Sequence, residues 1–497
     1  MRLSRRIVPA LAALSLCATV PLSTAEASGI AVARFGGAHG HPTATNPSAL
    51  YYNPAGIGMS EGTNIMLDVN LALRNASYER FGDAISLANP DEDYTAANTG
   101  RGEVSNVIAA PMIGITTDFG TDLPFAAGIA FYAPFGGQSV WDQADASEQY
   151  PGAQDGAQRW YVMDGTIRTL AITLGAAYHI EQLRLSIGVG VNLYLSEIDT
   201  VRARTVFGDD NLNNEGRSYL KATSTDFGIG VGVLAEPIED RLWVGLSYQT
   251  APGFNGELEM EGTLQNIFPP NYEDPSDITI TNQLPDILRW GFRYRPENDN
   301  FELRLFGDLT RWGGFEQQCI VGDDGLDLVN ERRGDNGQSA LDPYSVCEVR
   351  QDGSTREEGV DAAIIQNLVR RWQNAAGIRF GGSYYLGERF QNGQGEEIGA
   401  RVELQLDLGY DGNAIPDEAL EPALMDFKAI SVGIGARFRL ARVMHLSLLA
   451  SDFIYFERDT RGVETAERLV LPSSQPSSAG VYNQNIFVLN TNIEFSF

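Results

Sequence analysis

The chain has 497 residues, and 65 acidic side chains against 36 basic ones give it a net charge of −29 at pH 7. Such acidity excludes nucleic acid as a partner, because nucleic-acid recognition requires a basic surface. Beyond the first 27 residues there is no run of about 18 apolar residues, so no membrane-spanning helix is expected. A membrane location would therefore require a closed β-barrel.

Residues 1–27 have the pattern of a secretory signal peptide. Arg2, Arg5 and Arg6 precede an apolar stretch, and Ala25-Glu26-Ala27 supplies the small residues of a cleavage site. We therefore expect an exported protein whose signal peptide is removed before Ser28.

Residues 28–62 do not alternate like a strand. They contain a run rich in Asn, Pro, Tyr and Gly, whose members of interest are Asn46, Pro47, Tyr51, Tyr52, Asn53, Pro54, Ala55 and Gly56. Each proline restricts the residue before it to extended geometry, and Asn and Gly favour turns with side-chain-to-backbone hydrogen bonds. Because Leu50-Tyr51-Tyr52 is too apolar for comfortable exposure, a compact segment is favoured over a disordered tail.

From residue 63 onward the dominant pattern has a period of two. Between Leu183 and Ser196 the odd positions are all Leu, Ile or Val, whereas the even positions are Arg, Ser, Gly, Asn or Tyr. Successive strand side chains point to opposite faces, so one face is apolar and the other polar or small. Residues 401–410 and 430–440 repeat the pattern with Asp, Glu and Arg on the polar face, which suits a polar lumen and not lipid.

Counting such segments predicts an all-β fold: a 14-stranded antiparallel transmembrane β-barrel over residues 63–497. The segments are 63–81, 106–118, 124–136, 167–180, 182–199, 218–235, 241–262, 278–296, 300–313, 372–386, 397–411, 426–440, 443–457 and 485–497. Short connections alternate with long ones, as in bacterial outer-membrane barrels. The aromatic C-terminus, ending at Phe497, resembles the signal recognised by the outer-membrane assembly machinery. The expected surroundings are outer-membrane lipids.

The longest predicted loop, 314–371, contains both cysteines that remain after signal removal. Cys319 and Cys347 form an even pair in an exported chain, which predicts a disulfide. Later in the loop Val360, Ile364 and Leu368 lie at helical spacing. We interpret them as an apolar helix stripe that packs the loop, with a capture groove for lipophilic substrate as the alternative.

The run from Asn46 to Gly58 resembles the hatch signature of the FadL/TodX family of outer-membrane transporters for long-chain fatty acids and other hydrophobic compounds. Weaker matches follow at 128–136, 245–248 and 415–426, so the resemblance spans nearly the whole mature chain. It implies that residues 28–62 form a hatch inside the barrel. It also implies an internal ligand site and sideways release through a gap in the wall near the third strand.

The residues themselves offer a partial counterpart to that gap. Pro134 removes a hydrogen-bond donor near the end of the third strand, and Gly128 and Gly136 weaken its packing. A simple strand end explains Pro134 equally well.

A fatty acid requires an apolar slot for its tail and a cation for its carboxylate. Strand phase places Arg289 and Arg379 inside the barrel, far from the periplasmic ends, and they are the carboxylate candidates. The alternative is that lumen arginines pair with acidic residues such as Asp68, Glu403 and Asp407.

No cofactor or metal site is expected, and His39 and His41 are read as incidental. His445 and Ser447 both point inward, which argues against lipid hydrolysis and against an enzyme. The stronger rival to a transporter of hydrophobic compounds is a water-filled porin or a structural or adhesive barrel.

Overall fold

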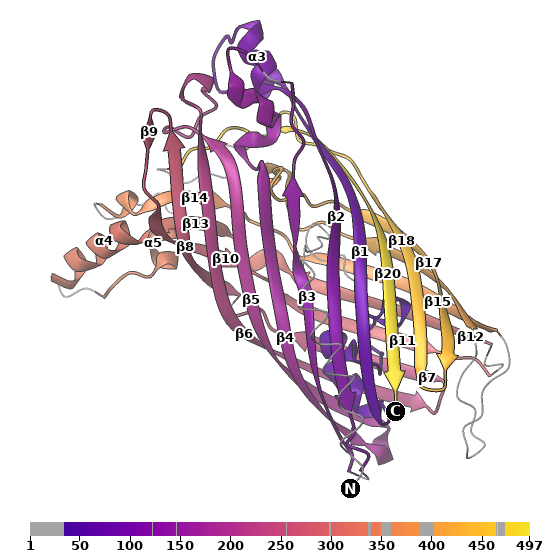
Figure 1. The fold of residues 1–497 in the computed structure, drawn as a ribbon. Helices are drawn as coiled ribbons and strands as arrows, with labels where there is room; N and C mark the ends of the chain where they lie inside the picture. The colour runs from indigo at the N-terminus through magenta and orange to yellow at the C-terminus, as the bar shows by residue number, and fades with distance from the viewer. Residues whose placement is uncertain are drawn as a thin grey trace, which may run out of the picture.

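The computed structural model describes residues 34–121, 123–145, 147–254, 256–297, 300–335, 339–348, 359–386, 402–463, 465 and 473–497. The predicted signal peptide and the start of the predicted strand at 397–411 lie outside these residues. The described chain forms a tall antiparallel barrel, tilted in Figure 1, with the C-terminus at its lower end.

Ten strands run along the barrel wall without interruption, and we call each such passage a crossing. They are β1 (Thr63–Arg80), β2 (Gly100–Thr117), β3 (Phe125–Val140), β4 (Asp164–Ile180), β5 (Leu185–Arg204), β6 (Gly216–Ile238), β16 (Val402–Asp411), β17 (Ala429–Ala441), β18 (Met444–Tyr455) and β20 (Gly480–Ser496). β1 pairs with β2 on one side and with β20 on the other, so the first and last strands close the barrel. Phe497 completes the closure by exchanging backbone hydrogen bonds with Thr63.

Four further crossings are each divided into two strands. The pairs are β7 (Leu242–Gln249) with β8 (Glu257–Phe268), β10 (Ser276–Gln283) with β11 (Asp286–Tyr294), β12 (Phe301–Arg311) with β13 (Gln317–Gly322), and β14 (Ile364–Val369) with β15 (Ala375–Leu386). Together with the ten continuous strands they make fourteen crossings, which confirms the predicted 14-stranded barrel. The two-residue strands β9 (Asn271–Tyr272) and β19 (Arg458–Asp459) add no crossing.

Prolines and glycines mark where these crossings break. Pro252 and Gly253 lie between β7 and β8, Pro285 lies between β10 and β11, and Gly313-Gly314 lie between β12 and β13. Proline cannot donate to a ladder, and glycine weakens a strand interior. The lower pieces β7, β11, β12 and β15 are 8 to 12 residues long, close to the length that a tilted strand requires to cross a bilayer.

Side chains alternate across the wall as the sequence indicates. On β5 the outward residues Ile187, Val189 and Val191 are 45–48% exposed, whereas the inward Ser186 and Asn192 are buried. The same phase holds Arg289 and Arg379 on the lumen side. No described helix is long and apolar enough to span a membrane.

Above the breaks, the upper strands β8, β10, β13 and β14 form a sheet that we call the extracellular extension. The sheet continues the barrel wall through β6, and α4 (Asp323–Asp335) and α5 (Pro343–Cys347) project sideways from it (Figure 1). A disulfide joins Cys319 of β13 to Cys347 of α5. Other short helices on the outer loops are η3 (Gly82–Ala84), α3 (Glu92–Asn98), η4 (Pro151–Asp155), η5 (Ala157–Trp160), η7 (Leu212–Asn214), η9 (Val360–Ala362) and η10 (Asp417–Ala419). η8 (Trp312–Gly314) lies in the break between β12 and β13, and η6 (Glu181–Leu183) forms a periplasmic turn.

The predicted helix over 360–369 is wrong. Only Val360–Ala362 is helical, and Ile364–Val369 is strand β14, paired with β13. A spacing of four residues also fits an even strand period, so the apolar stripe did not separate the two structures. Pairing with β13, which is distant in the sequence, makes this segment a strand.

Candidate functional site

The described hatch residues, 34–62, lie inside the lower part of the barrel (Figure 1). They form three short helices, η1 (Gly37–His39), α2 (Ala49–Tyr52) and η2 (Pro54–Met59). Phe35, Leu50 and Ile57 are at most 3% exposed and pack with barrel residues in one apolar cluster. The barrel therefore has no open lumen at this level.

Glycines on the facing wall allow the hatch to approach the strand backbone. A Cβ atom at Gly188 would lie 2.2 Å from the Ala55 nitrogen, and one at Gly245 would lie 2.3 Å from the Pro42 oxygen. Neither position has room for a side chain without moving the hatch. Similar close approaches involve Gly114, Gly175 and Gly232. The hatch is thus seated against β2 and β4 to β7.

Polar side chains of the hatch motif fix this seating. The Asn53 side chain donates to the Pro42 carbonyl at 2.8 Å and to the Val233 carbonyl of β6 at 3.0 Å, and accepts from the Ala55 amide at 3.2 Å. Asn46 accepts from the Ser48 amide and donates to Glu494 of β20 at 2.9 Å. These bonds satisfy groups that a plug without regular ladders would otherwise leave unpaired.

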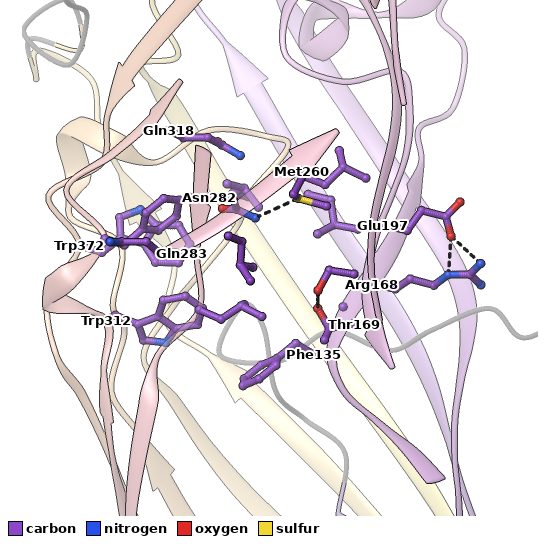
Figure 2. Close-up of a pocket in the computed structure, with 18 of the residues that line it drawn as sticks. Phe135, Arg168, Thr169, Glu197, Met260, Asn282, Gln283, Trp312, Gln318 and Trp372 are labelled. Carbon is purple, nitrogen blue, oxygen red and sulfur yellow. Dashed lines mark hydrogen bonds and ion pairs between the residues drawn. The ribbon is translucent and has the colours of Figure 1, made fainter. Parts of the chain in front are cut away.

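Above the hatch lies a largely hydrophobic cavity, which we call the apolar pocket. Figure 2 shows Trp312 and Trp372 on one side, with Phe135 and Thr169 across from them. The ring of Trp372 lies 4.8 Å from the rings of both Trp312 and Phe315. Leu258, Met260, Ile415 and Met425 add further apolar surface. Such a lining suits a hydrophobic molecule better than a hydrated ion.

The interruptions in the strands create this pocket. Trp312 and Phe315 lie in the break between β12 and β13, and Trp372 lies in the break between β14 and β15. Because these residues lie outside regular strands, their side chains do not have to alternate between the two faces of the wall, and all three are buried at 3–4% exposure. Sequence reasoning missed them, although aromatic residues beside Gly313-Gly314 in an otherwise strand-like stretch were a usable signal.

A second cavity, here called the arginine chamber, lies between the apolar pocket and the hatch. It shares Phe135 and Trp312 with the apolar pocket, and Tyr51 and Tyr52 form its hatch side. The structure places both predicted carboxylate candidates, Arg289 and Arg379, in its lining.

The two arginines differ in their partners. Arg379 forms ion pairs with Asp308 at 2.7 Å and with Asp411. Arg289 donates to the Gln249 side chain at 3.0 Å and lies 4.4 Å from the centre of the Tyr51 ring. No described carboxylate forms an ion pair with Arg289. Of the two candidates, Arg289 is therefore the one that retains capacity for a carboxylate ligand.

The third strand is irregular where the sequence places Pro134. The register with β4 shifts between Tyr132 and Phe135, and Gly136 adopts a φ of 133°. β2 and β3 pair only between Met112↔Tyr132 and Thr117↔Ala127. On the extracellular side of this paired region, the side chain of Asn106 on β2 donates a hydrogen bond to the Gln138 carbonyl on β3.

The three predicted gap residues thus occupy different environments. Pro134 and Gly136 lie at the register shift, beside the length of β3 that β2 leaves unpaired. Gly128 lies in the regularly paired part, where a Cβ atom would come within 3.2 Å of Leu50 in the hatch. Gly128 therefore contributes to hatch contact and not to the irregularity.

Comparison with known proteins agrees with the fold and the site. Residues 8–395 match the family model described as outer membrane protein transport protein (OMPP1/FadL/TodX). A comparison with curated protein sequences gave no significant match.

Solved structures of low sequence identity share the fold over most of the chain. A FadL homologue of Pseudomonas aeruginosa aligns with a TM-score of 0.66 at 15% identity, covering 96% of this chain and 99% of the homologue. The toluene transporter TbuX of Ralstonia pickettii gives 0.55 at 13% identity, with 90% and 94% covered. The toluene transporter TodX of Pseudomonas putida gives 0.55 at 12% identity, with 91% and 94% covered.

The family model covers well over half of the sequence, and its members are transport channels and not enzymes. The plugged barrel with an apolar pocket agrees with this assignment. The chain therefore belongs to the OMPP1/FadL/TodX family of outer-membrane transport proteins for hydrophobic compounds.

Proposed function

We propose that the protein carries long-chain fatty acids across the outer membrane. The observation that supports this substrate most is the position of Arg289 in a chamber that shares the lining residues Phe135 and Trp312 with the apolar pocket. The acyl chain would lie between the aromatic side chains of Trp312 and Trp372, and the carboxylate would reach the guanidinium of Arg289. A charge-assisted hydrogen bond of this kind orients an amphiphile that apolar contact alone would leave free to turn.

A second substrate class is supported by a different observation. The apolar pocket is rich in aromatic side chains, and two of the similar structures are named as toluene transporters. A monoaromatic hydrocarbon would occupy the apolar pocket without using Arg289. The two classes therefore make opposite predictions about that arginine.

Binding to the purified protein separates the two substrates. Arg289→Gln is expected to weaken oleate binding about tenfold, the value of one lost charge-assisted contact, and to leave toluene binding unchanged. Arg379→Gln is the contrasting variant, because Arg379 is already paired with Asp308 and Asp411. If oleate does not bind the wild-type protein and toluene does, the fatty-acid assignment is wrong.

We further propose that substrate leaves sideways, through the wall between β2 and β3. The support is the register shift at Pro134 together with the end of β2–β3 pairing at Met112↔Tyr132. Phe135, which follows the shift, lines both the apolar pocket and the arginine chamber. A substrate in either cavity would therefore lie next to the unpaired part of the wall, with lipid on its other side.

A further inference from the structure

A third cavity lies at the opposite end of the barrel and has a different character. It lies beneath the hatch, and we call it the periplasmic chamber. Its hatch side includes residues from 39–46 and Ser60, and its wall is formed by the periplasmic ends of β1, β11, β12, β15, β16, β17, β18 and β20. It shares no lining residue with the apolar pocket or the arginine chamber.

Basic groups outnumber acidic ones in its lining. Four arginines and three histidines face three glutamates; they are Arg293, Arg295, Arg437, Arg439, His39, His41 and His445 against Glu302, Glu403 and Glu494.

Each glutamate already has a partner. Glu302 pairs with Arg295 at 2.9 Å, Glu403 pairs with His39 at 2.9 Å, and Glu494 pairs with Arg437 at 2.5 Å. The three carboxylates of the chamber are therefore paired, and the arginines of its lining outnumber them by four to three.

Arg293 of β11 is an arginine of this lining that forms no ion pair with a described carboxylate. Among the described residues its guanidinium makes no ion pair, and its buried Nε has no hydrogen-bond partner. Its contact is with the face of Trp243, whose ring centre lies 3.9 Å from the guanidinium carbon. Stacking on a ring leaves the planar edge of an arginine, with its donor fork, available to an oxyanion.

His41 of the hatch presents a second unused donor. Its side chain is 2% exposed, and Nδ1 accepts a hydrogen bond from the Thr43 amide at 3.3 Å. In a neutral ring the proton is therefore on Nε2, which is buried and has no partner among the described residues. Burial, aided by the nearby Arg304 and Arg293, holds the pKa of His41 well below its ordinary value, so the ring is neutral at pH 7.

We propose that the periplasmic chamber binds a small oxyanion, a carboxylate or a phosphate, between Arg293 of the wall and His41 of the hatch. Neither donor has another partner among the described residues, and the lining has four arginines against three glutamates, which compensates the charge of the ligand. The mostly polar lining has no place for a long acyl chain, so the ligand is a hydrophilic ion from the periplasm. Because one donor belongs to the hatch and the other to the wall, the bound ion ties them together on the side away from the glycine-lined wall. This site does not depend on which hydrophobic compound the pocket carries.

The test uses the mature protein in detergent micelles, titrated with sodium phosphate and separately with sodium acetate at constant ionic strength. Binding is followed by calorimetry and by tryptophan fluorescence, because Trp243 contacts Arg293. We expect a saturable response to at least one anion, and the tighter of the two identifies the ligand class. Trp243→Phe should remove the fluorescence change and leave the calorimetric signal.

Arg293→Gln and His41→Phe should each weaken binding about tenfold or more. Arg184→Gln is the matched control, since it removes an arginine from an exposed periplasmic turn. Should Arg293→Gln not fold, His41→Phe tests the same site. The absence of saturable binding of either anion to the wild-type protein up to about 100 mM, or unchanged affinity in the variants, would overturn the proposal.

Discussion

Replacing Asn53 with alanine should release the hatch from the barrel wall. Asn53 is fully buried and makes three hydrogen bonds, two of them within the hatch and one to the Val233 carbonyl of β6. The substitution leaves two carbonyls and the Ala55 amide without this partner. A buried polar group left unpaired costs about 1–3 kcal/mol. Because only the bond to the Val233 carbonyl joins the hatch to the wall, the docked state should lose about 1–3 kcal/mol, which raises the population of undocked hatch about fivefold to 150-fold.

Planar-bilayer conductance measures that population directly. The wild-type protein should be nearly silent, because the hatch fills the lumen, whereas Asn53→Ala should show frequent openings. Asn75→Ala is the control, since Asn75 is exposed on β1 and accepts one bond from Ser105. Conductance of Asn53→Ala equal to that of the wild type would refute the inference that these hydrogen bonds hold the hatch. Large, steady channels in the wild-type protein would support a porin.

Three further predictions address the pocket and the outer loops. Trp372→Ala removes the side chain that packs on Trp312 and Phe315, and should weaken binding of a hydrophobic ligand about tenfold in equilibrium dialysis; unchanged affinity would place the ligand elsewhere. Replacing both cysteines of the Cys319–Cys347 disulfide, which are 28 residues apart, should destabilise the extracellular extension by about 3–4 kcal/mol. Limited proteolysis of the variant without these cysteines should then cut the extracellular extension while the barrel stays folded. Equal resistance to the protease in this variant and in the wild-type protein would contradict the prediction. Burial raises the pKa of Asp426 from 3.8 to about 7, so the folded loop 412–428 binds this proton more tightly than the unfolded loop. Its stability should fall as pH rises from about 4 to about 7 and stay level above that. Asp426→Asn should abolish the slope in hydrogen exchange of the Ala414 and Ile415 amides, corrected for intrinsic rates, and a slope that survives the substitution would show that another group titrates.

The barrel could be predicted because each crossing carries its own local signal. Alternation on β5, β16 and β17 is nearly complete, since one face meets lipid and the other the lumen. Among the predicted segments, alternation is least regular in the seventh and eighth, 241–262 and 278–296, and the structure divides both. Irregular alternation therefore indicated where the strands are interrupted, although it did not predict that the interruptions form a pocket.

The ligand pocket could not be predicted in the same way. Trp312 and Trp372 are 60 residues apart in the sequence and meet because two neighbouring crossings break at the same height. A contact of that kind depends on strand pairing, which period-two alternation does not specify. Arg289 and Arg379 were placed in the lumen by strand phase, but only the three-dimensional arrangement shows that Asp308 and Asp411 occupy Arg379.

Sideways exit between β2 and β3 is the central claim, and joining the two strands tests it most directly. Asn106→Cys and Gln138→Cys introduce thiols where the Asn106 side chain already reaches the Gln138 carbonyl across the unpaired wall, and a bifunctional, cleavable thiol reagent can link them. The control pair, Thr166→Cys with Asp199→Cys, joins positions that already face each other on β4 and β5. Uptake of a radiolabelled hydrophobic compound should stop on linking the first pair, return when the linker is cleaved, and be unaffected by linking the second. Uptake that continues at the same rate with the first pair linked would contradict lateral exit.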